Sequence, residues 1–177
     1  IKDSTITSSA QNGNGVFSYG ESTTVNISDS TIKTTADNSG GIQTTGGGTT
    51  NASNLTVETS GNSAAAIRSD RGGGTVNVDG GSYTSNGENS PAVYSTAAIT
   101  VKNADLTANN SEALVIEGQN SITLENCTVT GSMSDNGTSA DENLHNVMIY
   151  QSMSGDAEVG TSSLSITGGS LTGKSGD

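Results

Sequence analysis

Short apolar runs recur along the chain in a fixed order. In the first kind of run, two small or polar residues precede one hydrophobic residue, and threonine usually follows it. The hydrophobic members of this run are Ile6, Ile32, Leu55, Tyr83, Leu106, Val129 and Leu171. They lie about 25 residues apart, with one longer interval before Leu171. A fixed period of this length indicates a repeat architecture.

Two further runs keep step with the first. One begins with a small or aliphatic pair and then alternates, at residues 15–18, 41–44, 66–69, 92–95, 114–117 and 146–149. The other is an apolar–polar–apolar triplet at residues 25–27, 76–78, 99–101, 122–124 and 164–166. Alternation with a period of two is typical of a strand with one buried face, and glycine clusters separate the runs as turns.

These runs predict an all-β fold, a right-handed single-stranded parallel β-helix (β-solenoid). About seven coils of about 25 residues, each with three short strands, would stack at about 4.8 Å per coil. We expect residues 1–177 to form a single monomeric solenoid segment of a longer protein that continues into further coils or caps. The longer interval predicts an insertion at residues 132–163 within the sixth coil.

The composition at first suggests a disordered chain, but it is compatible with a β-solenoid. Only 29% of the residues are hydrophobic and the net charge is −12, a combination that favours disorder when the apolar residues are scattered. Here they are periodic, and a solenoid coil needs only one to three inward aliphatic side chains. The single cysteine, Cys127, lies in a strand-like run and is expected to be a buried packing residue.

The charge balance excludes several function classes. The chain has 18 acidic residues against 6 lysines and arginines, so it lacks the basic surface that nucleic-acid binding requires. It also has no apolar stretch long enough to span a membrane, so no membrane insertion is expected. Richness in Ser, Thr, Gly and Asn is compatible with an extracellular protein, secreted or attached to a bacterial cell wall.

Alternation in the second run predicts which side chains face outward. An inward aliphatic column is expected at Val16, Ile42, Ile67, Val93, Val115 and Val147, followed by an outward column at Phe17, Gln43, Arg68, Tyr94, Ile116 and Met148. Glu117 then falls at an inward place, which predicts a local bulge. Tyr83, in the first run, is expected in the core.

Aromatic and charged residues gather on this outward face, and stacked aromatic rings are a platform for sugar rings or for a partner's apolar patch. The predicted ligand-binding residues are Phe17, Tyr19, Arg68, Asp70, Arg71, Tyr94, Met148 and Tyr150. The alternative is that these aromatics only cover one another along the strand ladder.

Catalytic chemistry is not expected. The only histidine, His145, lies in the insertion as a loop residue, and no two aligned coils place carboxylates side by side on an exposed strand. No cofactor is expected, although Ca²⁺ could suit the oxygen ligands Asp135, Asp141 and Glu142. Their spacing does not match the EF-hand pattern, so a solvated acidic loop is the favoured interpretation.

Residues 14–20, 40–48, 66–74, 120–126 and 145–151 resemble segments of Ser/Thr/Gly-rich, adhesin-like proteins of gut Firmicutes. Those proteins have a right-handed parallel β-helix of the pectate-lyase-like superfamily. The resemblance covers nearly the whole chain and carries no catalytic motif, and it implies an exported bacterial surface protein.

Three functions therefore remain open. The first is a non-catalytic adhesin-like surface protein that binds a glycan or a host or cell-surface protein through its exposed strand face. The second is a structural spacer that displays another domain. The third and weakest is a polysaccharide lyase or hydrolase.

Overall fold

The computed structural model describes residues 1–133 and 144–174, which form an all-β, parallel β-solenoid of about five turns. Most of the strands are short because a solenoid coil turns at each corner. The strands are β1 (Thr5–Ser8), β2 (Val16–Tyr19), β3 (Thr24–Ser28), β4 (Thr31–Thr34), β5 (Ile42–Thr45), β6 (Gly48–Thr59), β7 (Ile67–Asp70), β8 (Gly74–Ser85), β9 (Val93–Ser95), β10 (Ala98–Lys102), β11 (Asp105–Ala108), β12 (Leu114–Glu117), β13 (Ser121–Gly131), β14 (Val147–Tyr150) and β15 (Ser163–Gly173).

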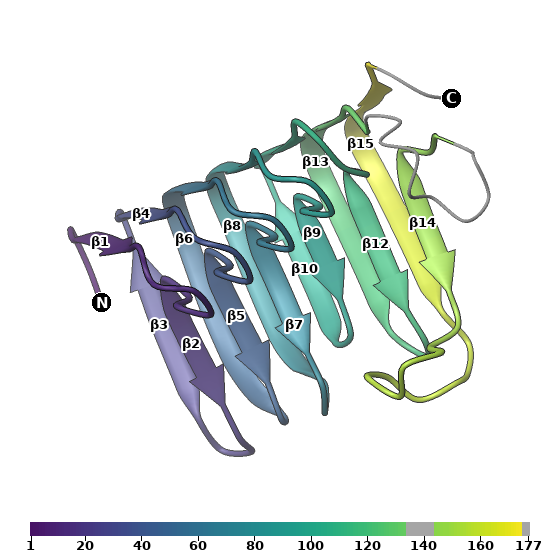
Figure 1. Ribbon diagram of the computed structural model, residues 1–177, viewed down its shortest axis with the longest axis horizontal. Coiled ribbons are helices and arrows are strands. Elements are labelled where there is room, and N and C mark those ends of the chain that lie inside the picture. Colours follow the sequence, from purple (N-terminus) through teal and green to yellow (C-terminus); the bar gives the residue numbers. More distant parts are fainter. Residues whose placement is uncertain (134–143, 175–177) are drawn as a thin grey trace.

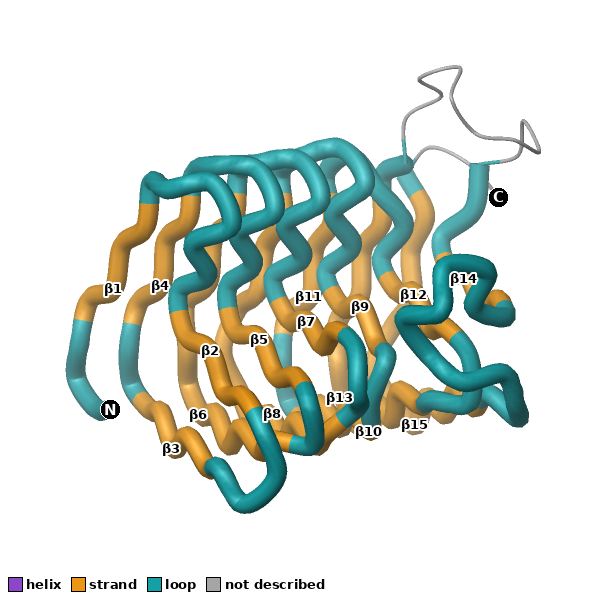
Figure 2. The backbone as a smooth tube through the Cα atoms, turned by 60° about the horizontal axis from the view of Figure 1, so that its bottom comes forward, coloured by secondary structure: helices purple, strands orange, loops and turns teal. Residues whose placement is uncertain are grey.

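These strands form two sheets in which all the strand pairings are parallel. Strands β2, β5, β7, β9, β12 and β14 make a six-stranded sheet, and the others make a nine-stranded sheet. Figure 1 shows the successive turns of the chain stacked one after another along the longest axis, from the N-terminal end to the C-terminal end. Figure 2 shows the chain passing between the sheets through loops on both sides of the stack.

The strand count per coil differs from the prediction of three separate short strands. In β6, β8, β13 and β15, two predicted segments run together as one strand of 11 or 12 residues. A single left-handed asparagine makes the corner in β6 (Asn54, φ 50°) and in β13 (Asn126, φ 54°), whereas two left-handed glycines stand at the corner in β8 and β15. Asparagine tolerates this conformation, so the corner bends the strand without interrupting its pairing. The seven predicted coils are likewise not confirmed, since about five turns are formed.

The core is a set of stacked aliphatic columns between the two sheets. Ile32, Val57, Tyr83, Leu106 and Val129 form one such column, and each is at most 1% exposed. The predicted burial of Tyr83 and Cys127 is confirmed. Because each coil stacks its apolar residues directly on those of its neighbours, few are needed per turn.

Buried hydroxyl groups complete the interior and hold the loops. The hydroxyls of Thr34, Thr59 and Ser85 are fully buried, and each donates to a carbonyl oxygen five residues later at 2.5 Å. Burying a hydroxyl without a partner is unfavourable, so the repeated bond makes a polar column compatible with the core. The described residues contain no helix long and apolar enough to cross a membrane.

Candidate functional site

The outward face of the six-stranded sheet carries two columns of side chains, because its strands pair in register. The first column is Phe17, Gln43, Arg68, Tyr94, Val115 and Met148. The second contains Tyr19, Thr45 and Asp70 towards one end and Glu117 and Tyr150 at the other. All the predicted binding residues except Arg71 lie in these columns, and Arg71 directly follows β7.

One coil departs from the predicted register by one residue. Leu114, not Val115, pairs with Val93, so Ile116 faces the core at 0% exposed. Glu117 then falls in the outward column, and no bulge interrupts its strand. The predicted orientations of Val115, Ile116 and Glu117 were therefore wrong. Residues 114–116 are all aliphatic, so alternation alone could not fix which of them enters the core.

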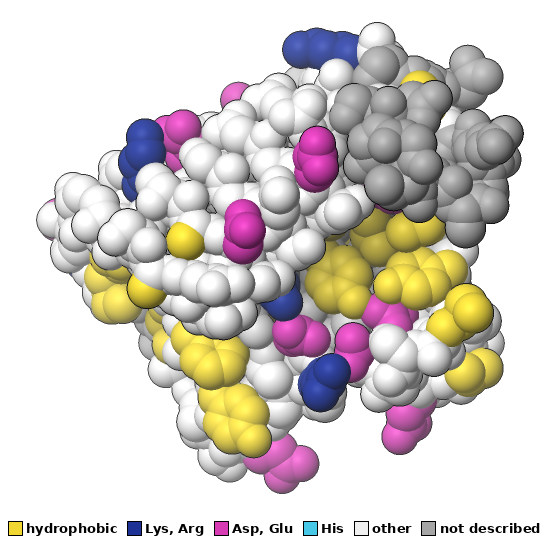
Figure 3. Space-filling view, in the orientation of Figure 1, with side chains coloured by type: hydrophobic (Ala, Val, Ile, Leu, Met, Phe, Trp, Pro, Cys, Tyr) yellow, Lys and Arg dark blue, Asp and Glu magenta, His cyan; other side chains and the backbone are white. Residues whose placement is uncertain are grey.

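At the N-terminal end the face is open to solvent. Phe17 is 50% and Tyr19 is 66% exposed, and their ring centroids lie 6.0 Å apart with an interplanar angle of 42°. Figure 3 shows hydrophobic side chains gathered at two places on the viewed face, with acidic and basic side chains between them. The predicted aromatic stripe is thus divided into two clusters.

At the other end the face is covered by residues 151–162, which we call the strap, between β14 and β15. Beneath it Glu117 is 1% exposed. Its Oε2 atom accepts hydrogen bonds from the hydroxyls of Tyr94 and, at 2.8 Å, Tyr150. Its Oε1 atom accepts a hydrogen bond from Ser154 Oγ of the strap at 3.3 Å. One carboxylate therefore joins three strands of the sheet to the strap.

The surroundings of Glu117 favour its ionised form. Burial is the largest single influence and raises its pKa, but hydrogen bonds from Ser152, Tyr94 and Tyr150 together lower the pKa below its usual value. Burial, followed by the hydrogen bond to Glu117, raises the pKa of Tyr150 to about 12. The same two causes raise the pKa of Tyr94 well above its usual value. The cluster is held as one carboxylate with two neutral phenols.

A hollow of about 550 Å³ opens beside this cluster, between the strap and strands β7 and β9. Arg68 and Asp70 form an ion pair along its wall, with 2.9 Å between Nη2 and Oδ2. Arg71 Nε lies 2.5 Å from Oδ1 of Asp156 in the strap. Tyr94 and Pro91 contribute apolar surface to the lining. The hollow therefore combines part of an aromatic ring with two cation–anion pairs.

Further contacts hold the strap in place. Gln119 Nε2 donates to Glu158 Oε2 at 2.8 Å, and Ser162 Oγ donates to the carbonyl oxygen of Gly118 at 2.6 Å. Within the strap region, Gln151 Nε2 donates to the carbonyl oxygen of Gly160 at 2.9 Å. These bonds position Asp156 over the end of β7. Asp156 there contacts Arg71, which lies 85 residues earlier in the chain.

Sequence reasoning missed two residues of this site. Glu117 was assigned to the interior, although an acidic residue that ends an aliphatic strand already indicated a wrong register. Asp156 was not singled out because the strap has no repeating pattern that would place it. Only the fold brings Asp156 to Arg71.

Metal and histidine predictions have separate outcomes. The Ca²⁺ candidates Asp135, Asp141 and Glu142 lie outside the described residues. Among residues 1–133 and 144–174, no group of three His, Cys, Asp or Glu side chains could hold a metal ion. His145 precedes β14 in a loop, and its Nε2 atom lies 3.1 Å from Oε1 of Glu112.

Comparison of the chain with protein-family models, curated proteins and solved structures finds no match. The parallel solenoid is therefore supported by the strand pairing alone. The similarity to adhesin-like proteins of gut Firmicutes stays a prediction from the residues quoted above.

Proposed function

We propose that this chain is a non-catalytic, carbohydrate-binding part of an adhesin-like bacterial surface protein, and that the hollow beside the strap is its glycan site. The observation that carries the proposal is the placement of the Tyr94 ring beside two ion pairs, Arg68–Asp70 and Arg71–Asp156. Carbohydrate sites use this combination, because the ring packs on the apolar face of a pyranose while the charged groups bond its hydroxyls.

The charges of the hollow favour a neutral sugar. Arg68 is paired with Asp70 and Arg71 with Asp156, so the four charges of the lining cancel. The chain as a whole has a net charge of −12, which repels anionic glycans. The Arg71 side chain is 74% exposed and uses Nε for Asp156, which leaves its terminal amino groups directed to solvent for a ligand's hydroxyls.

The two other candidate functions receive less support. A catalytic tyrosine base would need a lowered pKa, whereas the pKa values of Tyr94 and Tyr150 are raised. A structural spacer is compatible with the stacked core, but it gives no role to the ion pairs and the tyrosine that line the hollow. We include in the proposal a right-handed path and a secreted or cell-wall-attached location.

A glycan array tests this function, with the unmodified chain compared with Arg71→Ala. An exposed ion pair contributes at most about 1 kcal/mol, so Arg71→Ala is expected to fold normally while its binding of neutral glycans falls at least about tenfold. Lys33→Ala is the matched control, because Lys33 forms an exposed ion pair with Glu58 at 3.3 Å on the other sheet. Equal binding by Arg71→Ala would exclude the hollow as the site, and no binding by the unmodified chain would favour the spacer.

A further inference from the structure

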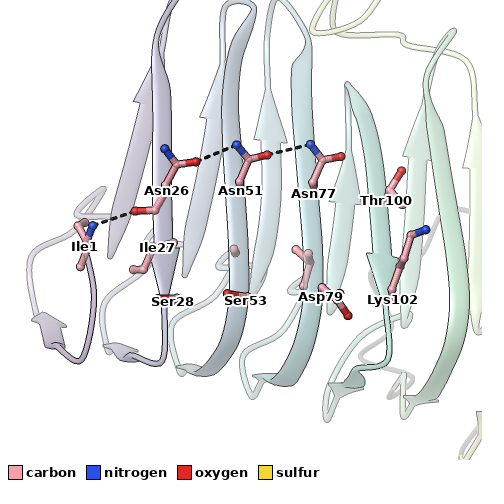
Figure 4. Close-up of a pocket in the computed structure, with 12 residues that line it drawn as sticks. Ile1, Asn26, Ile27, Ser28, Asn51, Ser53, Asn77, Asp79, Thr100 and Lys102 are labelled. Atoms are coloured by element: carbon pink, nitrogen blue, oxygen red, sulfur yellow. Dashed lines mark hydrogen bonds between the residues drawn. The ribbon is translucent and has the colours of Figure 1, made fainter.

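A ladder of asparagine side chains crosses the outward face of the nine-stranded sheet. Asn26 of β3, Asn51 of β6 and Asn77 of β8 are paired in register. Asn51 Nδ2 donates to Asn26 Oδ1 at 2.9 Å, and Asn77 Nδ2 donates to Asn51 Oδ1 at 2.9 Å. Figure 4 shows these three amides in one row, each turned towards the next. Nothing in the proposed glycan site involves this face.

Each amide of the ladder keeps hydrogen-bonding capacity for a ligand. A side-chain amide carries two N–H donors and an oxygen with two acceptor positions, and the ladder uses one donor or one acceptor at each contact. One N–H and one acceptor position of Asn51 are therefore left unused, and Asn26 and Asn77 are exposed. Because the neighbouring amides fix one another's orientation, a ligand would not have to order them on binding.

A second row of polar side chains runs parallel to the ladder. In register it consists of Ser28, Ser53, Asp79 and Lys102. Figure 4 shows Ser28, Ser53 and Asp79 alongside the three amides. Both rows line a hollow of about 720 Å³. Its N-terminal part is uncharged in both rows, and Asp79 and Lys102 mark where charge begins. The apolar residues Ile27, Ala52 and Val78 lie between the two rows, so the hollow has an apolar floor and polar edges.

The spacing of the rows selects between extended polymers. Neighbouring strands lie about 4.8 Å apart, so equivalent amides recur at that interval. An extended peptide advances about 3.3 Å per residue, and its side chains on one face recur at about 6.6 Å, out of step with the rows. An extended β-1,4-linked glycan advances by close to one strand spacing per sugar. Each sugar also offers hydroxyls that both donate and accept.

We propose that this two-row face binds a linear neutral polysaccharide that lies along the solenoid axis, with one sugar unit per strand. The amide ladder bonds the hydroxyls along one edge of the polymer, and the Ser28, Ser53 and Asp79 row bonds the other edge. The face has no aromatic side chain among its lining residues, so each sugar contributes little and affinity depends on the number of strands occupied.

The test measures the affinity of the chain for β-1,4-linked gluco-, xylo- and manno-oligosaccharides of two to six units by calorimetry. At least one series is expected to bind more tightly with each added unit until the ladder is filled. Its affinity should change little with salt, because the ligand is neutral and most of the contacts are to uncharged amide and hydroxyl groups. Asn51→Ala removes both hydrogen bonds of the middle amide and is expected to weaken hexasaccharide binding about tenfold.

Asn109→Ala is the matched control, since Asn109 Nδ2 donates to Asn86 Oδ1 at 2.7 Å in another exposed amide pair that does not line the hollow. It should bind like the unmodified chain, and so should Arg71→Ala, whose defect concerns only the proposed glycan site. No binding in any series, binding independent of length, or equal loss in Asn51→Ala and Asn109→Ala would overturn the proposal. The dependence of affinity on oligosaccharide length is measured with the unmodified chain, so it tests the proposal even if Asn51→Ala does not fold.

Discussion

The two ends of the outward face of the six-stranded sheet share one strand register but have different surroundings. Tyr19 and Glu117 occupy the same column, and Tyr19 is 66% exposed whereas Glu117 is 1% exposed. The difference comes from the strap, which covers β12 and β14 but does not reach β2. Hydrogen bonds from Tyr94 and Tyr150 then satisfy the carboxylate that the strap buries.

This comparison shows that the position of a residue in the repeat determines whether its side chain points inward or outward, but not how exposed that side chain is. An outward side chain at the open end is available to a ligand, whereas an outward side chain at the covered end becomes part of a second, polar interior. Between the two ends, Arg68, Arg71 and Asp156 lie at the edge of the strap, partly fixed and partly accessible. The proposed glycan site lies at this boundary.

The largest expected effect separates core from surface within one predicted column. Ile116→Ala removes a fully buried side chain and is expected to lower the free energy of unfolding by about 2–5 kcal/mol. Phe17→Ala, at the open end, is expected to lower it by less than about 1 kcal/mol, since Phe17 is half exposed. Urea unfolding of both variants measures the difference. Similar losses would contradict the register that places Ile116 inside.

Much of the fold could be predicted from the sequence because the repeat is regular. Apolar residues of the first run became a stacked core column, as with Ile32, Tyr83 and Leu106, although Val57 takes the place in it that was predicted for Leu55. What could not be predicted was the continuity of strands around a corner such as Asn54, since a left-handed residue can either end a strand or bend it. The structure forms about five turns, so the seven coils counted from the repeat period are not confirmed.

The site was less predictable than the fold. Strand alternation was enough to place Phe17, Arg68 and Tyr94 on one face. It did not work at residues 114–116, where three aliphatic residues follow one another. The strap has no periodicity, so its contact with Arg71 depends on a chain path that no local pattern specifies.

A smaller effect is expected from the carboxylate beneath the strap. Glu117→Ala leaves the hydroxyls of Tyr94 and Tyr150 without their acceptor, and an unsatisfied buried group costs about 1–3 kcal/mol. The loss should be local, so limited proteolysis within the strap is expected to accelerate about tenfold or more. Glu117→Gln keeps an acceptor oxygen and should show a smaller change. Tyr19→Ala, in the same column at the open end, is the control and should leave strap proteolysis unchanged.

The smallest expected effect is on pH dependence, and it distinguishes a covered tyrosine from an open one. Burial beneath the strap and the bond to Glu117 raise the pKa of Tyr150 from 10.0 to about 12. Because the folded state favours the neutral phenol, this contribution to stability is complete below pH 10 and is lost as the pH rises from 10 through about 12. We therefore expect the strap to become protease-sensitive only in that range, while the rest of the solenoid stays folded.

Ultraviolet absorbance of the phenolate measures this titration, with the spectrum of Tyr150→Phe subtracted to isolate Tyr150. A midpoint near 12 is expected in the unmodified chain, and one closer to 10 in Glu117→Gln, because the neutral amide no longer opposes the phenolate charge. If Tyr150 titrates near 10 in the unmodified chain, the strap does not bury it in solution. Both ends of the face would then be open to solvent, and the hollow proposed as the glycan site would lack the wall that the strap provides.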